Sequence, residues 1–295
     1  MIRGQELVRQ ILLPRKIESH KGDYGSVVIL GGSVGFTGAA YLASEAAVRG
    51  GAGLVFLAVP ESIYPILAVK TEAAMAFPVS ESHGRVCTGA LPAIKEKLSR
   101  AKVLVLGCGL GRGEETEKTV FDLVATASVP VVLDADGINA FEGNIDKLRG
   151  RDLVLTPHEG ELARLGFHRA PGESRAEAAL RAAKTFNAVT VFKGPGTAVA
   201  APDGRLFVNT TGNPGMAKGG SGDVLAGMIV SLLGQKQFWP DPHNLDPHRA
   251  QLTAWAVFFH GQTGDRCAGE LGKYGMTPSD MLAAIPNVLK DHESA

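Results

Sequence analysis

The chain has 295 residues, 45% of them hydrophobic, and its 30 Lys and Arg residues balance 30 Asp and Glu residues. This neutral balance excludes the strong basic field typical of proteins that bind nucleic acid or anionic membranes. The three cysteines form no Cys-x-x-Cys pair, and no apolar leader is evident. No run approaches the ~18 apolar residues of a membrane span. These features together predict a reduced, cytoplasmic enzyme.

After a polar lead segment over residues 1–22, short apolar runs alternate with stretches of helical periodicity. The apolar runs predict strands at residues 26–30, 54–59, 103–106, 129–134, 153–156 and 190–193. The helical stretches lie at residues 39–49, 90–99, 115–127, 160–166, 174–186, 223–233, 247–267 and 277–289. Residues 197–201 and 205–208 predict a hairpin, because Pro202-Asp203-Gly204 between them is a turn sequence.

The alternation of strands and helices predicts an α/β fold with a mainly parallel central sheet covered by helices on both faces. In such a fold, ligands bind at the carboxyl ends of the strands. No break in composition and no internal repeat marks a second domain, so we expect one domain over residues 1–295. The segment 235–248, rich in Pro and His, is expected to be a surface loop.

The most informative segment runs from Asn213 to Gly227 and reads Asn-Pro-Gly-Met-Ala-Lys-Gly-Gly-Ser-Gly-Asp-Val-Leu-Ala-Gly. Its glycines lead into an apolar helical run, so backbone N–H groups can converge where the helix begins and favour a phosphate or an oxyanion. We expect this anion hole at Gly220, Ser221, Gly222 and Asp223. Asp223 would face the bound anion and take the proton of a hydroxyl group during phosphoryl transfer.

A purely structural alternative exists for this segment, because Asp is a favoured N-cap residue and Gly-Ser-Gly-Asp often only begins a helix. Five glycines within fifteen residues weigh against that alternative. Glycine costs chain entropy, and so many are expected only where the backbone must approach a ligand closely. We therefore interpret the segment as functional.

Two other glycine-rich loops follow expected strands. The loop Gly31–Gly38 lacks the Gly-Lys-Ser/Thr ending of a Walker A loop, which argues against a P-loop NTPase. The loop Gly107–Gly113 carries Arg112 where the dinucleotide-binding fingerprint requires glycine. Either loop could equally be a tight turn, so the residues alone leave their role open.

Carboxylates occur at two further strand ends. Asp134 and Asp136 would lie on one side of the pleat and suit Mg²⁺ carried by a nucleotide, with an Asx-type turn as the alternative. The segment Thr156-Pro-His-Glu-Gly-Glu161 lacks the second His of a zinc protease motif. His158 could contact a ligand while Glu159 or Glu161 organises metal-bound water, unless the glutamates only suit the first turn of a helix.

The segment Lys193-Gly-Pro-Gly-Thr197 ends another strand. A lysine beside exposed backbone N–H groups is placed to bind the phosphates of a nucleotide, although a lone Lys-Gly is usually a surface turn. His260 and Asp265, on a later helix, are expected to be ordinary polar residues near its solvent end.

In their order along the chain, these segments resemble the NAD(P)H-hydrate dehydratase family of the ribokinase-like superfamily. The matching segments are His20–Ser33, Gly38–Ala40, Gly107–Gly111, Asp134–Asn139, Thr156–Glu161, Lys193–Thr197 and Gly212–Asp223. The similarity extends from about His20 to Leu289, and Asn213–Gly227 is its most specific part. It implies a ribokinase-like three-layer fold.

The resemblance implies a hydro-lyase that repairs a damaged cofactor. Such an enzyme dehydrates the S-epimer of NADH or NADPH hydrate and converts ADP to AMP, or ATP to ADP, with release of phosphate. Asp223 would deprotonate the ring hydroxyl group, which then attacks the terminal phosphoryl group. Because phosphate is a much better leaving group than hydroxide, the lone pair of the ring nitrogen could then expel it.

Roles for single residues follow from their positions in the family pattern. The nucleotide would be held by Lys193, Gly194, Pro195, Gly196, Thr197 and Gly222. The hydrate would face Ala39 or Ala40, Gly109, His158 and Asp223, while Glu161 and Asp136 are the candidates for the Mg²⁺ shell. The resemblance also implies a homotetramer and a separate NAD(P)H-hydrate epimerase as a metabolic partner. The segment 235–248 looks longer than the usual connection, which could alter contacts in the oligomer.

Two rival interpretations are weaker. A kinase for a small vitamin alcohol shares the Gly-x-Gly-Asp helix start, but Pro157–Glu161 together with Asn213–Met216 speaks against it. A nucleotide-binding sensor would favour a neutral residue beside phosphates, whereas this chain has Asp223. The choice between ADP and ATP, the choice between NADH and NADPH hydrate, and any need for a monovalent cation stay open, although the short form resembles bacterial members and favours ADP.

Overall fold

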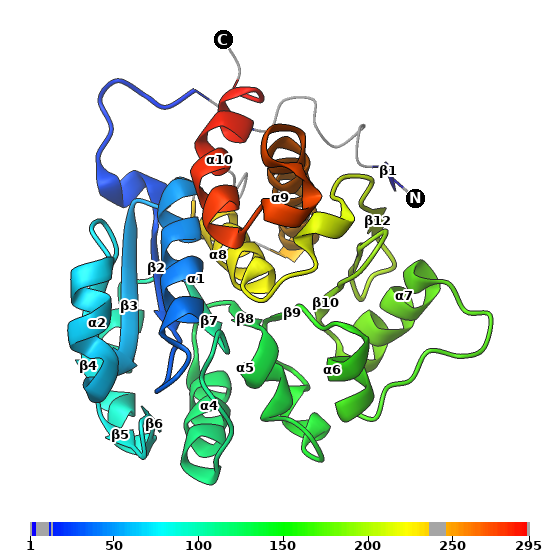
Figure 1. Ribbon diagram of the computed structural model, residues 1–295. Helices are drawn as coiled ribbons and strands as arrows, with labels where there is room; N and C mark the ends of the chain where they lie inside the picture. The colour runs from blue at the N-terminus through cyan, green and yellow to red at the C-terminus, as the bar shows by residue number, and fades with distance from the viewer. Residues whose placement is uncertain (1, 4–11, 13, 236–245, 294–295) are drawn as a thin grey trace.

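A sheet of ten strands forms the centre of the computed structural model, which describes residues 2–3, 12, 14–235 and 246–293 (Figure 1). The strand order is β1-β12-β11-β10-β9-β8-β7-β2-β3-β4. The strands are β1 (Ile2–Arg3), β2 (Ser26–Leu30), β3 (Leu54–Pro60), β4 (Met75–Val79), β7 (Val103–Leu106), β8 (Val131–Leu133), β9 (Leu153–Leu155), β10 (Val189–Phe192), β11 (Ala198–Ala200) and β12 (Leu206–Val208). A separate small hairpin pairs β5 (Glu81–Ser82) with β6 (Arg85–Val86).

The strands from β4 to β10 run parallel to one another across the sheet. Only β11 runs antiparallel to its neighbours, β10 on one side and β12 on the other, and it forms the predicted hairpin with β12. Parallel strands are buried on both faces, which is why β2 and β7 read as continuous apolar runs. The predicted mainly parallel sheet is confirmed.

Helices cover both faces of this sheet (Figure 1). One face is covered by α1 (Thr37–Arg49), α2 (Tyr64–Lys70), α8 (Ser221–Gly234), α9 (Asp246–Gly275) and α10 (Pro278–Lys290). The other face is covered by α3 (Leu91–Leu98), α4 (Glu114–Thr126), α5 (Ala135–Asn139), α6 (Glu159–Arg164) and α7 (Arg175–Phe186). Single 3₁₀ turns occur at Lys21–Tyr24, Glu61–Ile63, Thr88–Ala90, Ile145–Leu148 and Pro214–Met216. The predicted three-layer α/β fold is therefore correct.

The pleat divides the apolar side chains between two cores, one on each face. In β2, Val27 and Ile29 pack beneath α1 and α8, whereas Val28 and Leu30 pack toward α3 and α4. Within the described residues, no helix combines the length and the apolar character needed to cross a membrane.

Some elements escaped the sequence analysis. The edge strand β4 contains Pro78 and is half-exposed, so it lacks the signal of a buried strand. The helix α2 and the hairpin β5–β6 are short and lie beside it. The later helix α9 continues to Gly275, beyond the predicted end at residue 267, and its backbone is non-helical at Gly272.

The predicted geometry of Asp134 and Asp136 was wrong. The strand β8 ends at Leu133, Asp134 is the N-cap residue of α5, and Asp136 lies in the first turn of that helix. The two carboxylates therefore do not share one side of a pleat, because the chain has already left the extended conformation when it reaches Asp136.

Two predicted segments are covered only in part. The lead segment 1–22 includes residues 1, 4–11 and 13, which lie outside the described residues; in the described part, the guanidinium of Arg15 lies 3.8 Å from the ring centroid of Tyr24. The predicted surface loop 235–248 includes residues 236–245, which also lie outside them. Its first residue, Gln235, is buried, and its side-chain amide donates to the Gly50 carbonyl oxygen at 3.1 Å.

Candidate active site

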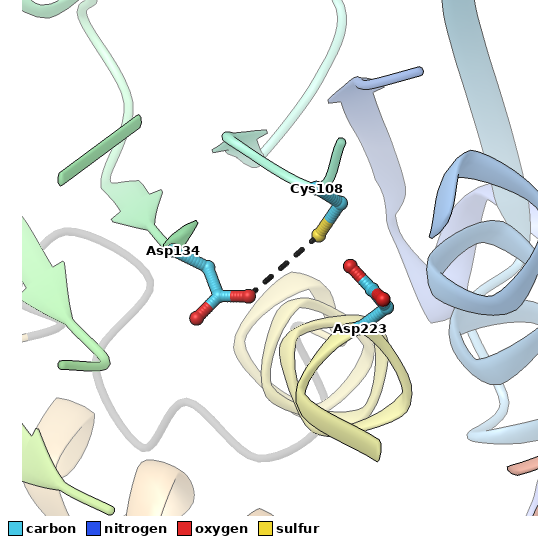
Figure 2. A group of neighbouring side chains, drawn as sticks. All are labelled: Cys108, Asp134 and Asp223. Atoms are coloured by element: carbon cyan, nitrogen blue, oxygen red, sulfur yellow. Dashed lines mark hydrogen bonds between the residues drawn. The ribbon is translucent and has the colours of Figure 1, made fainter. Parts of the chain in front are cut away.

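The candidate residues gather where the parallel strands end and α8 begins. Cys108 follows β7, Asp134 follows β8, and Asp223 lies in the first turn of α8. Figure 2 shows the three side chains pointing toward one another, with the Cys108 sulfur between the two carboxylates. One polar atom from each lies within 4.8 Å of the others. The carboxyl edge of the sheet is where an open α/β sheet places its ligand site.

The first turn of α8 leaves backbone donors without a protein partner among the residues that the structure describes. Its N-cap residue is Gly220, with φ of 103°, and no side chain caps the helix. Within the described chain, no protein acceptor takes the N–H groups of Gly222 and Asp223. A side chain at Gly220 would also meet Leu42, since a Cβ there would lie 2.6 Å from Leu42 Cδ1. The helix start thus offers free donors together with the positive end of its dipole.

Asp223 does not act as the cap of this helix. It stands three residues after Gly220, which is the N-cap residue. The alternative in which Asp223 caps the helix is therefore wrong, although an acidic residue in the first turn also favours the helix dipole. Ser221 adds a second donor, because its hydroxyl oxygen is buried and has no hydrogen-bond partner in the described chain. A buried hydroxyl without a partner is costly, and a bound anion would satisfy it.

The pKa of Asp223 is raised to about 6. Burial is the main cause, and the negative charge of Asp134 adds to it, while a hydrogen bond from the Cys108 thiol and the charge of Lys193 act in the opposite direction. Burial and the same two carboxylates raise the pKa of Cys108, which stays a neutral thiol. A carboxylate with a pKa near neutrality is suited to accept a proton as a general base.

Lys193 projects beneath the first turn of α8. Its ammonium nitrogen lies 2.7 Å from Asp134 Oδ1 and 3.6 Å from Glu161 Oε2. A Cβ at Gly222 would lie 3.6 Å from the same nitrogen. Burial opposes the charge of Lys193, but Asp134 and Glu161 outweigh it and raise the pKa of the ammonium group. The lysine is thus held charged at the anion-binding turn.

His158 and Glu161 bind each other across the start of α6. The His158 N–H donates to Glu161 Oε2 at 2.7 Å, and the Glu161 N–H donates to His158 Nδ1 at 3.2 Å. Because Nδ1 accepts, the neutral His158 ring carries its proton on Nε2. Glu161 is buried, whereas the His158 side chain is 52% exposed, with its Nε2 3.4 Å from Glu161 Oε1.

Asp136 faces a different loop. Its Oδ2 accepts the Gly111 N–H at 2.9 Å, and its Oδ1 accepts from the Asn139 amide at 3.2 Å. The carboxylate is half-buried and fixes the loop that follows β7. This contact gives Asp136 a role in holding the loop after β7, which the sequence did not predict.

Of the expected substrate residues, Ala39 and Gly109 lie together. Gly109 has φ of 68°, and a Cβ there would lie 2.8 Å from Ala39 Cβ. The loop after β7 therefore closes directly on the start of α1. Ala40, in contrast, is fully buried, so its side chain faces the core. Ala39 is the better-placed member of the pair.

The predicted nucleotide loop forms a tight turn. Thr197 Oγ1 donates to the Gly194 carbonyl oxygen at 2.8 Å and accepts the Gly194 N–H at 3.2 Å. Gly194, Pro195 and Gly196 are exposed at the edge of the sheet. Because both backbone groups of Gly194 are bonded to Thr197, the exposed backbone of Pro195 and Gly196 is the part that a ligand can reach.

The expectation that His260 lies near the solvent end of its helix is wrong. The residue is buried, and its Nε2 lies 2.9 Å from the Ser221 carbonyl oxygen, to which it donates. Burial lowers the pKa of His260 to about 4, so the ring is neutral. The side chain therefore supports the first turn of α8 from below.

Asp265 supports the chain that leads into this turn. Its Oδ2 accepts the Gly212 N–H at 2.8 Å, and its Oδ1 accepts from the Asn213 side-chain amide at 3.0 Å. His260 and Asp265 share one face of α9 with Gly261 and Gly264. The glycines allow close approach, since a Cβ at Gly264 would overlap the side chain of Met216. The His-Gly-x-x-Gly-Asp spacing is the sequence signal that could have identified this support.

Comparison with known proteins adds to this geometry. A model of the NAD(P)H-hydrate dehydratase family matches residues 27–287. The chain is 42% identical over 287 residues to the bifunctional NAD(P)H-hydrate repair enzyme Nnr of Moorella thermoacetica, a match that covers 95% of this chain and 52% of the relative. The chain thus spans about half the length of that relative.

Shorter relatives match along their whole length. The ADP-dependent (S)-NAD(P)H-hydrate dehydratase of Bacillus subtilis is 33% identical, and the match covers 98% of both chains. The structure of the B. subtilis ADP/ATP-dependent NAD(P)H-hydrate dehydratase co-crystallised with ATP/Mg²⁺ superposes with a TM-score of 0.77 at 30% identity, covering 98% of this chain and 97% of the other. A ribokinase-like superfamily protein of Enterococcus faecalis gives a TM-score of 0.83 at 26% identity, covering 99% and 95%.

Proposed function

Because the chain belongs to the NAD(P)H-hydrate dehydratase family, we propose that it dehydrates the S-epimer of NADH or NADPH hydrate at the expense of ADP or ATP. The observation that carries this proposal is the pairing of a base with an anion site. Asp223, with a pKa near 6, lies in the same uncapped helical turn that offers the free N–H groups of Gly222 and Asp223.

In the first step, the Asp223 carboxylate takes the proton of the ring hydroxyl group. The oxygen of that hydroxyl group attacks the terminal phosphorus of the nucleotide. A bond forms between this oxygen and phosphorus, and the bond from phosphorus to the bridging oxygen breaks, which releases AMP from ADP. The N–H groups of α8, the Ser221 hydroxyl and the Lys193 ammonium are placed to stabilise charge on the phosphoryl oxygens.

In the second step, phosphate leaves. The lone pair of the ring nitrogen expels it as the carbon–oxygen bond breaks, and the neighbouring ring carbon then loses a proton to restore the dihydropyridine. Phosphorylation is what makes this possible, because hydroxide is a poor leaving group at neutral pH. Ala39 and Gly109 close one side of the site, and the exposed His158 ring is placed to contact the hydrate from another.

Mg²⁺ belongs to this proposal as the companion of the nucleotide phosphates, whose charge it would neutralise. It prefers oxygen ligands and usually keeps several water molecules. Glu161 and Asp136 supply carboxylate oxygens at the carboxyl-terminal edge of the sheet, and both accept hydrogen bonds from the protein. They fit an ion held partly through water.

The proposal extends to the setting of the enzyme. The M. thermoacetica relative is named a bifunctional repair enzyme, so an NAD(P)H-hydrate epimerase that supplies the S-epimer is the expected metabolic partner. We also propose that the enzyme prefers ADP, because the B. subtilis relative is named ADP-dependent. A cytoplasmic homotetramer is what the family resemblance implies, and we include it in the proposal. Light scattering of the purified protein would measure its oligomeric state directly.

The test is a spectroscopic assay with purified protein, NADH hydrate, Mg²⁺ and either ADP or ATP. Return of the dihydropyridine absorbance with release of phosphate is expected, and it should be lost in Asp223→Asn while nucleotide binding persists. Phosphate transfer to a small vitamin alcohol, with no return of absorbance, would replace the proposal with the kinase. Full activity in Asp223→Asn would remove this residue from the mechanism.

A further inference from the structure

Arg175 lies against the outer side of the loop proposed to hold the nucleotide. It is the first residue of α7, and its Nη1 donates to the Lys193 carbonyl oxygen at 2.7 Å. Its guanidinium carbon lies 4.5 Å from the ring centroid of Phe192, the last residue of β10. The ring and the carbonyl group together fix the guanidinium plane.

The contact with Gly194 is equally close. Gly194 has φ of 144°, and a Cβ there would lie 2.6 Å from the Arg175 guanidinium carbon. A side chain at this position would displace the end of the arginine, and the positive φ also favours glycine. The guanidinium therefore lies directly against the exposed backbone of the loop.

The charge of Arg175 is incompletely neutralised. Its nearest carboxylate oxygen is Glu159 Oε2, 3.9 Å from Nη2 and beyond hydrogen-bond distance, while Oε1 of the same glutamate lies 3.3 Å from Arg169. The Arg175 side chain is only 20% exposed, and burial lowers its pKa. A partly desolvated cation that no close carboxylate neutralises is favourably placed to bind an anion.

The neighbouring cation, Lys193, lies on the other side of the loop. The Lys193 ammonium points inward to Asp134 and Glu161, beneath the first turn of α8. The sequence predicted only that Lys193 would lie beside the phosphates of a nucleotide. In the structure its charge lies beneath α8, and the cation against the outer side of the loop is Arg175.

We propose that Arg175 binds a phosphate group of the nucleotide held by residues 193–197, while Lys193 serves the anion-binding turn of α8. This inference rests on the proposed nucleotide-dependent function. The planar guanidinium suits two oxygens of one phosphate group, and its position is already fixed by Phe192 and the Lys193 carbonyl group.

The test compares the binding of ADP and adenosine to wild type and Arg175→Met by equilibrium titration. Loss of a charge-assisted hydrogen bond to phosphate should weaken ADP binding by about 10- to 100-fold and leave adenosine binding unchanged. Arg175→Lys should recover part of the ADP affinity. A matched control is Arg181→Met: Arg181 lies on the same helix and over Phe167 at 4.0 Å, but it pairs with Glu173 at 2.7 Å.

Each outcome decides the matter. Equal weakening of ADP and adenosine, or unchanged ADP binding in Arg175→Met, overturns a direct phosphate contact. If Arg175→Met does not fold, Arg175→Lys carries the test, and weakened ADP binding with intact adenosine binding supports the proposal. A wild-type protein that turns over NADH hydrate while the Arg175 variants bind ADP normally refutes this inference alone. A wild-type protein that binds neither ADP nor ATP refutes the proposed function as well.

Discussion

The ammonium nitrogen of Lys193 lies 2.7 Å from Asp134 Oδ1, and the two side chains are only 18% and 3% exposed. This ion pair joins the ends of β10 and β8, two strands separated in the sheet by β9. Asp134 also accepts from the Thr156 hydroxyl at 2.6 Å, at the end of β9. One buried carboxylate at the end of β8 therefore binds residues at the ends of two neighbouring strands, β9 and β10, beneath α8.

Lys193→Met should destabilise the fold by about 3–5 kcal/mol, because it leaves the carboxylate of Asp134 buried without its partner. Urea unfolding followed by circular dichroism measures the change. The double variant Lys193→Met with Asp134→Asn should lose less stability than Lys193→Met alone, since no charge is then stranded. Equal stability of the two variants would show that Asp134 does not depend on the lysine.

The pH dependence of the rate should report the ionisation of Asp223. The carboxylate must be ionised to accept a proton, so kcat should rise with pH through about 6 and level off above it. His260 is already neutral across this range, since burial lowers its pKa to about 4. A rate that is constant from pH 5 to pH 8, measured with saturating nucleotide, would contradict the role of Asp223 as the base.

Ionised Asp223 should also lower the free energy of unfolding at neutral pH. Its pKa is raised from 3.8 to about 6, so ionisation is harder in the folded protein than in the unfolded chain. The penalty is absent below pH 3.8, grows as pH rises from there to about 6, and is complete above it, at up to about 3 kcal/mol. Asp223→Asn should thus be more stable than wild type at pH 7.5, and the difference should vanish at low pH. Thermal unfolding at several pH values checks this.

The sequence predicted most of the central sheet because parallel strands buried on both faces are continuous apolar runs. It also predicted a helix after the glycines of the segment 213–222, and α8 begins there at Ser221. The anion hole at this turn stays a prediction, which depends on the argument that crowded glycines cost chain entropy that a close ligand contact can offset. The edge strand β4 could not be predicted in the same way, because its half-exposed residues and Pro78 resemble a loop. Local pattern also gave no sign that Lys193 would turn inward, because its partners Asp134 and Glu161 lie far earlier in the chain.

Substitution of His260 tests whether its hydrogen bond from α9 positions the first turn of α8. His260→Leu removes the donor to the Ser221 carbonyl oxygen, and we expect kcat to fall about tenfold because the N–H groups of α8 lose their alignment. His260→Gln, whose amide nitrogen can reach a similar position, should recover much of the rate. The stability of both variants, measured by thermal unfolding, provides the control. If leucine and glutamine lower kcat equally, the hydrogen bond does not position the turn.

Gly227 shows how the position of α8 is set by its packing on α1. A Cβ at Gly227 would overlap the Ala43 carbonyl oxygen and lie 2.7 Å from Ala46 Cβ, so Gly227→Ala should push the two helices apart and destabilise the protein by about 1–3 kcal/mol. Gly269→Ala is the matched control on α9, where a Cβ meets nothing within 4 Å. That change should instead stabilise the helix by about 0.5–1 kcal/mol.

The Gly227 change should also reach the active site. Gly227 lies one turn after Asp223 on the same helix, so a displaced α8 moves the carboxylate away from the phosphoryl group that it must serve. We expect kcat to fall more than nucleotide affinity, because the loop 193–197 connects β10 to β11 and is anchored by the sheet rather than by the helix. Steady-state kinetics and nucleotide titration on the folded variant separate the two effects. Unchanged kcat and unchanged stability in Gly227→Ala would contradict the prediction, because they would show that α1 and α8 can accommodate a methyl group between Gly227 and Ala43.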